Sequence, residues 1–345
     1  MAAEFLRTTV VGSYPQPDWL INKPMLHGQF VPRVKAGELW RVDPEVREEA
    51  LRDATTLAIR DMEDAGLDVV TDGEVCRESY TNHFVTALAG VDSEQPAAIV
   101  NRRGRELLVP RVIGPVRHHM PVEVAWVRFL RAQTERITKV TLPGPFTLSQ
   151  QVKDEYYGDA ETLAMEFAVA LNIEAHLLQE TGVDVIQFDE PWLRNNPEAA
   201  RVFGVRSLDR ALQGLRVGTA VHVCFGYAFL RKGQKPDAYE FLTELASSKV
   251  QEISIEAAQP GIDLAVLKEL PGKRIALGVL DHSTPEAEPV ETVARRIRAA
   301  LQIVPPERLS PAPDCGMKYM SRDVAFSRLK NLCLAAAEVR RELSV

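Results

Sequence analysis

Eight short apolar runs, each separated from the next by a longer stretch, limit most strongly what this chain can fold into. Apolar runs that alternate with amphipathic helices are typical of βα units, which build a parallel sheet. The runs cover residues 8–12, 67–72, 137–142, 183–188, 219–224, 250–256, 274–279 and 308–311. Eight such units predict an α/β protein with a closed (β/α)8 TIM barrel. An open, doubly wound sheet is the alternative.

Stretches with helical spacing of apolar residues follow most of these runs. They cover residues 44–65, 160–181, 207–214, 237–247, 262–270, 290–303 and 322–343. Gly66 follows the first of them, and glycine is the residue that most often ends a helix. We therefore expect the helices to form an outer layer around the strands.

One connection is far longer than an ordinary βα loop. It spans residues 75–136, between the second and third runs. Within it, residues 98–100 and 107–112 flank the sequence NRRGRE and predict a hairpin, and residues 121–132 predict a helix. This insertion could form a flap over the barrel mouth or only add packing. Because no linker or repeat interrupts the chain, we expect one domain over residues 1–345.

Charge and composition exclude several classes of partner. The formal net charge is −7, which gives no electrostatic reason to bind nucleic acid or an anionic membrane. No apolar stretch approaches the ~20 residues that span a bilayer, and the N-terminus lacks a secretory signal. The four cysteines do not have the spacing of a disulfide framework. We expect a cytoplasmic protein.

Four potential metal ligands lie where three of the apolar runs end. His222 and Cys224 are two residues apart, so on a strand they share a face, and Glu256 and Cys315 end later runs. One imidazole, two thiolates and a carboxylate suit tetrahedral Zn²⁺. Ligands spread over so much chain need a scaffold that is already folded, which favours a catalytic zinc over a structural one. The alternative is that His222 and Cys224 form a buried core pair.

Polar residues follow the other runs as well. Ser13 follows the first run, Glu74 the second, Asp189 the fourth and His282 the seventh. In a barrel these ends meet at one face, where catalytic groups gather. Single acids after a strand can be helix caps, but buried charge at so many ends is costly unless it is paired or bound to metal.

Seven segments resemble the catalytic half of cobalamin-independent methionine synthases. They are TTVVGSYPQP (8–17), LDVVTDGE (67–74), LPGPFTL (142–148), GVDVIQFDEP (182–191), VHVC (221–224), ISIEAA (253–258) and PAPDCGMK (311–318). The resemblance implies a (β/α)8 barrel whose zinc ligands are His222, Cys224, Glu256 and Cys315. The chain resembles a short, core-type member that lacks the N-terminal barrel of the full-length enzymes.

The same resemblance implies a zinc-dependent methyltransferase that makes methionine from L-homocysteine. Zinc would hold the acceptor sulfur as a thiolate, which attacks a methyl carbon. Glu74 and Asp189 match the acids that hold the amino group, and Ser13 lies in the loop that meets the carboxylate. His282 is the expected proton donor to the leaving group.

The methyl donor stays open between a methylfolate and a methylcorrinoid, the latter carried by a corrinoid protein as partner. The family's folate-contacting tryptophan and glutamate are replaced near Gln151 and Asn195. The basic residues of the predicted hairpin could clamp an anionic donor or form a solvated turn. They are Arg102, Arg103 and Arg105.

Other functions remain as alternatives. One is a zinc-dependent thiol alkyltransferase with another acceptor, for example one that performs epoxide:coenzyme M transfer or a demethylation. Two carboxylates suit an ammonium group better than a sulfonate, although Arg77 or Arg194 could serve an anion. Uroporphyrinogen decarboxylases share the architecture but need no zinc. A zinc-storing or corrinoid-binding module would have no need for Glu74 and Asp189.

Overall fold

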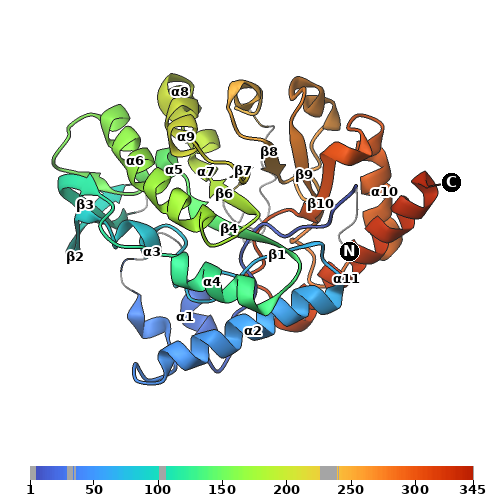
Figure 1. The fold of residues 1–345 in the computed structure, drawn as a ribbon, viewed down its shortest axis with the longest axis horizontal. Coiled ribbons are helices and arrows are strands. Elements are labelled where there is room, and N and C mark those ends of the chain that lie inside the picture. The colour runs from blue at the N-terminus through green and yellow to red at the C-terminus, as the bar shows by residue number, and fades with distance from the viewer. Residues whose placement is uncertain are drawn as a thin grey trace.

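A curled sheet of seven parallel strands forms the centre of the protein (Figure 1). The computed structural model describes residues 5–28, 34, 36–100, 106–225, 239 and 241–344. The strands are β1 (Val69–Val70), β4 (Ile137–Pro143), β6 (Val185–Asp189), β7 (Gly218–Val223), β8 (Glu252–Ile255), β9 (Arg274–Leu280) and β10 (Leu309–Pro313). They pair in this order, so the carboxyl ends of all seven lie on one side. Seven of the eight predicted strands are therefore confirmed, with altered bounds.

The first predicted strand, residues 8–12, is not a strand in the structure. The segment lies between the two edge strands of the sheet: Val69 of β1 donates to the Thr8 carbonyl at 3.0 Å, and Thr9 donates to the Pro311 carbonyl of β10 at 3.1 Å. The next two carbonyls accept from side chains instead. Lys139 donates to Val10 and Gln187 donates to Val11. These side chains take the place of the backbone N–H groups of a neighbouring strand. Residues 8–12 therefore do not form the strand that their apolar sequence predicts.

Helices cover the outside of the sheet, and most lie close to the predicted positions. They are α2 (Arg47–Ala65), α6 (Ala160–Gln179), α9 (Val205–Ala211), α10 (Val290–Leu301) and α11 (Arg322–Leu343). Gly66 ends α2 with φ of 97°, a left-handed conformation that favours glycine. Helices α2 and α11 lie side by side although they are far apart in sequence (Figure 1).

Two predicted helices were wrong in type. The stretch 262–270 forms a 3-10 helix, Leu264–Glu269, and the stretch 237–247 contains the 3-10 helix Thr243–Ser247. Most of residues 237–240 lie outside the described part. Short elements that the sequence did not predict are α1 (Lys23–Gly28), α5 (Pro145–Ser149), α7 (Pro191–Asn195), α8 (Pro197–Ala199), a π-helix (Ala200–Gly204) and two 3-10 helices (Gly37–Leu39 and Pro306–Arg308).

The insertion between β1 and β4 contains the predicted hairpin and helix. Strands β2 (Ala89–Val100) and β3 (Glu106–Arg117) pair antiparallel, and β5 (Lys153–Asp154) extends them to a three-stranded second sheet. The insertion also holds α3 (Asn82–Val85) and α4 (Val124–Gln133), of which α4 is the predicted helix with a later start. The tip of the hairpin, with Arg102, Arg103 and Arg105, lies outside the described residues.

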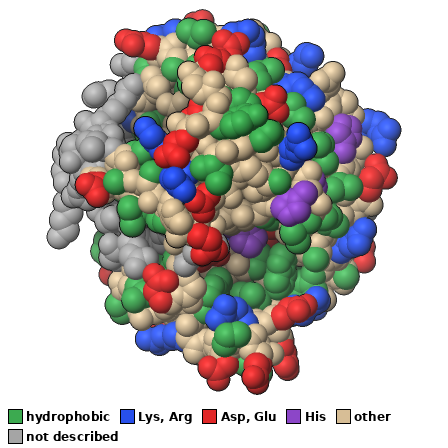
Figure 2. Space-filling model, turned by 90° about the vertical axis from the view of Figure 1, so that its left-hand side faces the viewer, with side chains coloured by type: hydrophobic (Ala, Val, Ile, Leu, Met, Phe, Trp, Pro, Cys, Tyr) green, Lys and Arg blue, Asp and Glu red, His purple; other side chains and the backbone are tan. Residues whose placement is uncertain are grey.

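The face of the protein in Figure 2 carries charged side chains of both signs. On the face shown in Figure 2, acidic and basic side chains are interspersed among the coloured residues, and no large patch of one sign stands out. None of the helices in the described part of the chain has the length and apolar character of a membrane span.

Candidate active site

Four side chains from three strand ends meet at the carboxyl side of the sheet. His222 lies in β7, Cys224 directly follows β7, Glu256 directly follows β8, and Cys315 lies two residues beyond β10. Their ligand atoms all lie within 4.8 Å of one another. Each of these residues is between 1% and 8% exposed. The structure therefore brings together all four residues that the sequence singled out as metal ligands.

The donor set fits a divalent metal ion. His222 Nδ1 is 2.9 Å from Ser254 Oγ, which leaves Nε2 for a ligand bond, and this buried atom has no hydrogen-bond partner among the described residues. Burial and the nearby Cys224 raise the pKa of Glu256, and a hydrogen bond with Cys224 and burial raise the pKa of Cys315. Three acidic groups thus crowd together, and a cation would stabilise their charged forms.

Residues outside the cluster fix the loops that carry it. The Tyr239 hydroxyl accepts from Glu256 N at 2.7 Å and lies 3.1 Å from the Val223 carbonyl, so it joins the ends of β7 and β8. Asp314 accepts hydrogen bonds from the backbone N–H groups of residues 257–259, directly after Glu256. Sequence reasoning missed Ser254 and Tyr239. Ser254 could have been found, because it lies two residues before Glu256 on the same strand.

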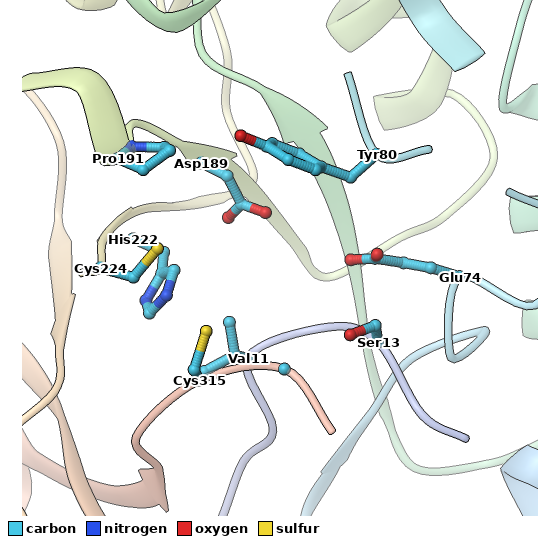
Figure 3. Close-up of a pocket in the computed structure, with 10 residues that line it drawn as sticks. Val11, Ser13, Glu74, Tyr80, Asp189, Pro191, His222, Cys224 and Cys315 are labelled. Carbon is cyan, nitrogen blue, oxygen red and sulfur yellow. The ribbon is translucent and has the colours of Figure 1, made fainter. Parts of the chain in front are cut away.

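A pocket extends from the cluster toward two carboxylates. It is lined by Val11, Ser13, Glu74, Tyr80, Asp189, Pro191, His222, Cys224, Cys315 and Gly316. Figure 3 shows the thiols of Cys224 and Cys315 at one end, Glu74 and Ser13 at the other, and the Asp189 carboxylate between them. The structure thus brings all three predicted acceptor-binding residues to one pocket with three of the four cluster residues.

Glu74 is held in an unusual backbone conformation. Its φ is +52°, which is uncommon for a residue other than glycine, and its N–H donates to Asp72 Oδ1 at 2.9 Å. Its Oε1 accepts from Thr141 Oγ1 at 2.8 Å. Gly12 permits this placement, because a Cβ there would lie 2.4 Å from Glu74 Oε1. The two N-terminal motifs therefore fit each other at this contact.

Asp189, in the middle of the pocket, and Ser13, at its far end, are the other two predicted acceptor-binding residues. Asp189 Oδ1 accepts from Gln187 Nε2 at 2.8 Å, and burial raises the pKa of Asp189 to about 7. Ser13 Oγ is buried and has no hydrogen-bond partner among the described residues. A buried hydroxyl without a partner is costly, so a polar ligand atom at this position would be favourable.

The neighbouring acid of the DEP sequence has a structural role. Glu190 accepts from the N–H groups of Phe146 and Thr147 and therefore caps the short helix α5. A Cβ on Gly144 would lie 2.0 Å from the Glu190 side chain. The LPGPFTL and DEP segments therefore pack against each other through Glu190. Asp189 is the acid of the DEP sequence that lines the pocket.

Tyr80, from the insertion, is a pocket residue that sequence reasoning missed. Its ring lies over Asp189 (Figure 3), and its hydroxyl accepts from Gln151 Nε2 at 3.5 Å. Burial raises the pKa of Tyr80, so it stays a neutral phenol. Its sequence neighbourhood gave no signal of this position, because no strand precedes it directly. The insertion therefore supplies at least one wall of the pocket.

Arg77 is not available to bind an anionic substrate. It is 1% exposed, its Nε lies 3.0 Å from Glu123 Oε1, and it donates to the Thr141 carbonyl at 2.9 Å. Glu123 also belongs to a second group of possible ligands, with Cys76 and His83. Because the Arg77 guanidinium already neutralises Glu123, that group has no need of a metal ion. Arg194 lies with its guanidinium 4.4 Å from the Phe225 ring centre.

His282 lies beside the cluster but is absent from the pocket lining. Its Nε2 is 2.9 Å from the Cys315 carbonyl and its Nδ1 is 3.2 Å from Arg328 Nη1. A carbonyl only accepts and a guanidinium only donates, so the ring is neutral with hydrogen on Nε2. Burial lowers the pKa of His282 to about 4, which agrees with this state. Its role as a proton donor stays a prediction.

The fold and this cluster define a class of α/β enzyme. In this class, a pocket at the carboxyl ends of the strands contains cysteine thiols arranged as metal ligands. The chain belongs to the family described as "Cobalamin-independent synthase, Catalytic domain", whose sequence model matches residues 6–338. It is accordingly a methyltransferase of the methionine synthase family.

Individual relatives agree over almost the whole chain. The methionine synthase of Thermococcus kodakarensis is 32% identical over 100% of this chain and 96% of its own length. A B12-independent methionine synthase from Shewanella sp. W3-18-1, solved in complex with selenomethionine, is 34% identical with a TM-score of 0.89 and 99% of each chain covered. A putative vitamin-B12 independent methionine synthase from Listeria monocytogenes shares the fold at 19% identity, with a TM-score of 0.72 over 98% of this chain and 99% of its own.

Proposed function

We propose that this enzyme transfers a methyl group to the thiol of L-homocysteine and releases methionine. The observation that carries the proposal is the polarity of one pocket. The thiols of Cys224 and Cys315 and the His222 imidazole lie at one end, Glu74 and the buried Ser13 hydroxyl lie at the other, and the Asp189 carboxylate lies between them. Homocysteine has a matching order of groups, with a thiol at one end and an ammonium and a carboxylate at the other. The Shewanella relative, solved with selenomethionine, supports an amino-acid ligand of this shape.

The roles of the residues follow from the groups they present. His222, Cys224, Glu256 and Cys315 would hold a zinc ion, and the buried, unpartnered His222 Nε2 supports that assignment. When bound, zinc would lower the pKa of the acceptor thiol, so that it reacts as a thiolate at neutral pH.

Away from the thiols, Glu74 and Asp189 would bind the ammonium group, and Ser13 Oγ would donate to the carboxylate. His282 is proposed to supply a proton to the leaving group as an imidazolium. Because the ring is neutral in this structure, Nδ1 would first have to part from Arg328 and take up a proton.

The enclosing scaffold is proposed to be a complete (β/α)8 barrel. Residues 8–12 would take the place of the eighth strand and close the barrel, because they connect β1 and β10 by backbone hydrogen bonds. The chain would then be one domain in which the insertion forms part of the pocket wall through Tyr80.

The methyl donor is proposed to be a methylfolate or a methylcorrinoid, the latter presented by a partner protein. An acceptor with a sulfonate, as in epoxide:coenzyme M transfer, has less support. It would face Glu74 and Asp189, and the buried Arg77 is already paired with Glu123.

Calorimetric titration of the zinc-loaded protein with L-homocysteine tests the proposal. Runs in buffers of different ionisation enthalpy report the number of protons released. We expect binding of one homocysteine with release of its thiol proton. Absence of binding, or binding without proton release, would contradict the proposed acceptor chemistry. The metal-stripped protein serves as the control and should bind weakly without releasing a proton.

A further inference from the structure

The interior of the sheet contains a buried polar column beneath Asp189. Lys139 of β4 and Gln187 of β6 are 2% and 0% exposed. Barrel interiors are usually filled by branched apolar side chains, and a buried ammonium or amide is costly unless it is fully hydrogen-bonded. Gln187 and Asp189 are two residues apart on the same strand, so their side chains point to the same face.

The column ends on the pocket acid. Lys139 Nζ donates to Gln187 Oε1 at 2.9 Å, and Gln187 Nε2 donates to Asp189 Oδ1 at 2.8 Å and to the Val11 carbonyl at 2.9 Å. Lys139 also donates to the Val10 carbonyl. One amide therefore receives the lysine on its oxygen and directs both of its N–H groups to acceptors.

The partners fix the direction of this amide. An ammonium group can only donate, so the amide oxygen must face Lys139, and the amide nitrogen must face Asp189. If Lys139 were absent, the amide could turn over and bring its oxygen toward the carboxylate, which would repel it. Burial lowers the pKa of Lys139 to about 8, which leaves it mostly protonated at neutral pH and able to donate.

We propose that Lys139 and Gln187 are positioning residues that hold the Asp189 carboxylate for the ammonium group of the acceptor, and that they thereby make the pocket selective for an α-amino thiol. The proposal rests on the proposed function, because it takes homocysteine as the acceptor. Neither residue lines the pocket, so they act only through Asp189. Lys139 and Gln187 also donate to the carbonyls of Val10 and Val11, so they could act only by stabilising the fold. The test must separate that structural role from the positioning of Asp189.

The test compares two thiols that differ in one group. γ-Mercaptobutyrate is homocysteine without its amino group, so it keeps the thiol and the carboxylate. We would measure dissociation constants of both thiols by calorimetry on zinc-loaded wild-type enzyme and on Gln187→Met. The variant should bind homocysteine about 10-fold or more weakly, since a hydrogen bond to a charged group is lost, and should bind γ-mercaptobutyrate as the wild type does.

Additional variants keep the outcome interpretable. Lys139→Met should produce the same loss of selectivity. If Gln187→Met does not fold, Gln187→Asn replaces it, because the shorter amide cannot reach both Lys139 and Asp189. In an Asp189→Asn background, Gln187→Met should cause no further loss of homocysteine affinity. Gln179→Glu, a change at the end of α6 remote from the pocket, is the control and should leave both constants unchanged.

Two results would overturn the proposal. Equal weakening of both thiols in the Gln187 and Lys139 variants would show a purely architectural role, and an additive effect of Gln187→Met and Asp189→Asn would show that Gln187 does not act through Asp189. A wild-type enzyme that does not prefer homocysteine to γ-mercaptobutyrate would instead overturn the proposed function. Failure of the inference and failure of the proposed function are therefore distinguishable.

Discussion

The metal-type end of the pocket and its acid end are built on different kinds of structure. His222, Cys224 and Glu256 follow from a regular ladder, in which Ala220 to Val223 of β7 pair in register with Glu252 to Ile255 of β8. At the acid end the support is mixed. Asp189 ends β6 and pairs in register with His222 of β7, but β1 is only two residues long, residues 8–12 form no strand, and Glu74 has a positive φ. Side chains, among them Thr141 and Gln187, hold this end in place.

The difference shows how one sheet can support two tasks. Backbone ladders place ligand atoms with little freedom, which suits a metal ion with fixed geometry. Side-chain hydrogen bonds place carboxylates whose positions can be tuned by changes one layer below the pocket. The two ends should therefore respond to substitution separately, with metal affinity sensitive at one end and acceptor affinity at the other.

The largest expected effect is at the metal-type end. Cys315→Ser replaces a thiolate ligand by a hydroxyl, and we expect it to remove zinc and activity together. The loss should exceed the ~100-fold in metal affinity that removal of an outer hydrogen-bond partner costs. Metal analysis by mass spectrometry and an assay of methyl transfer check this prediction. Full turnover by the variant would refute a role for Cys315 as a ligand.

Asp189→Asn should show the opposite pattern. The change removes the negative charge opposite the proposed ammonium group, so homocysteine should bind about 10- to 100-fold more weakly, the range for a hydrogen bond to a charged group. Zinc content should stay at the wild-type value, because Asp189 is not one of the four clustered ligands. Calorimetry and metal analysis on the same sample measure both. Unchanged homocysteine affinity would remove the argument for this acceptor.

Ser254→Ala tests the metal-type end without changing one of the four clustered residues. Ser254 Oγ lies 2.9 Å from His222 Nδ1 and orients the ring. Loss of such a partner typically lowers metal affinity about 10-fold or more. Competition with a chromogenic chelator measures it. Homocysteine affinity at saturating zinc should change little, and a larger change there than in zinc affinity would contradict the separation of the two ends.

Thr141→Val is the matched change at the acid end and should have the smallest effect. It removes the hydroxyl that donates to Glu74 Oε1 at 2.8 Å but keeps the shape of the side chain. We expect homocysteine to bind about 5- to 10-fold more weakly, because a single hydrogen bond positions Glu74 from this side. Zinc affinity should equal that of the wild type. A fall in zinc affinity instead would mean that the two ends share their support.

Much of the metal-type end could be predicted from the sequence because the relevant signals are local. An apolar run predicts a strand, and a polar residue at its end predicts a group at the sheet edge, so His222, Cys224, Glu256 and Cys315 were found together. The helices α10 and α11 followed from their periodicity in the same way. The strand predicted for residues 8–12 was wrong for the opposite reason: the carbonyls of Val10 and Val11 accept from Lys139 and Gln187, which are far away in sequence.

The sequence by itself determined the order of strands and helices, the family, and which residues come to the carboxyl edge of the sheet. Only the tertiary structure decided that Glu190 caps α5 while Asp189 faces the pocket. It also decided that Arg77 is paired with Glu123 and that Tyr80 of the insertion lines the pocket. The physical reason is the range of the interactions. Periodicity and strand ends are properties of neighbouring residues, whereas hydrogen-bond partners and charge compensation depend on groups that only folding brings together.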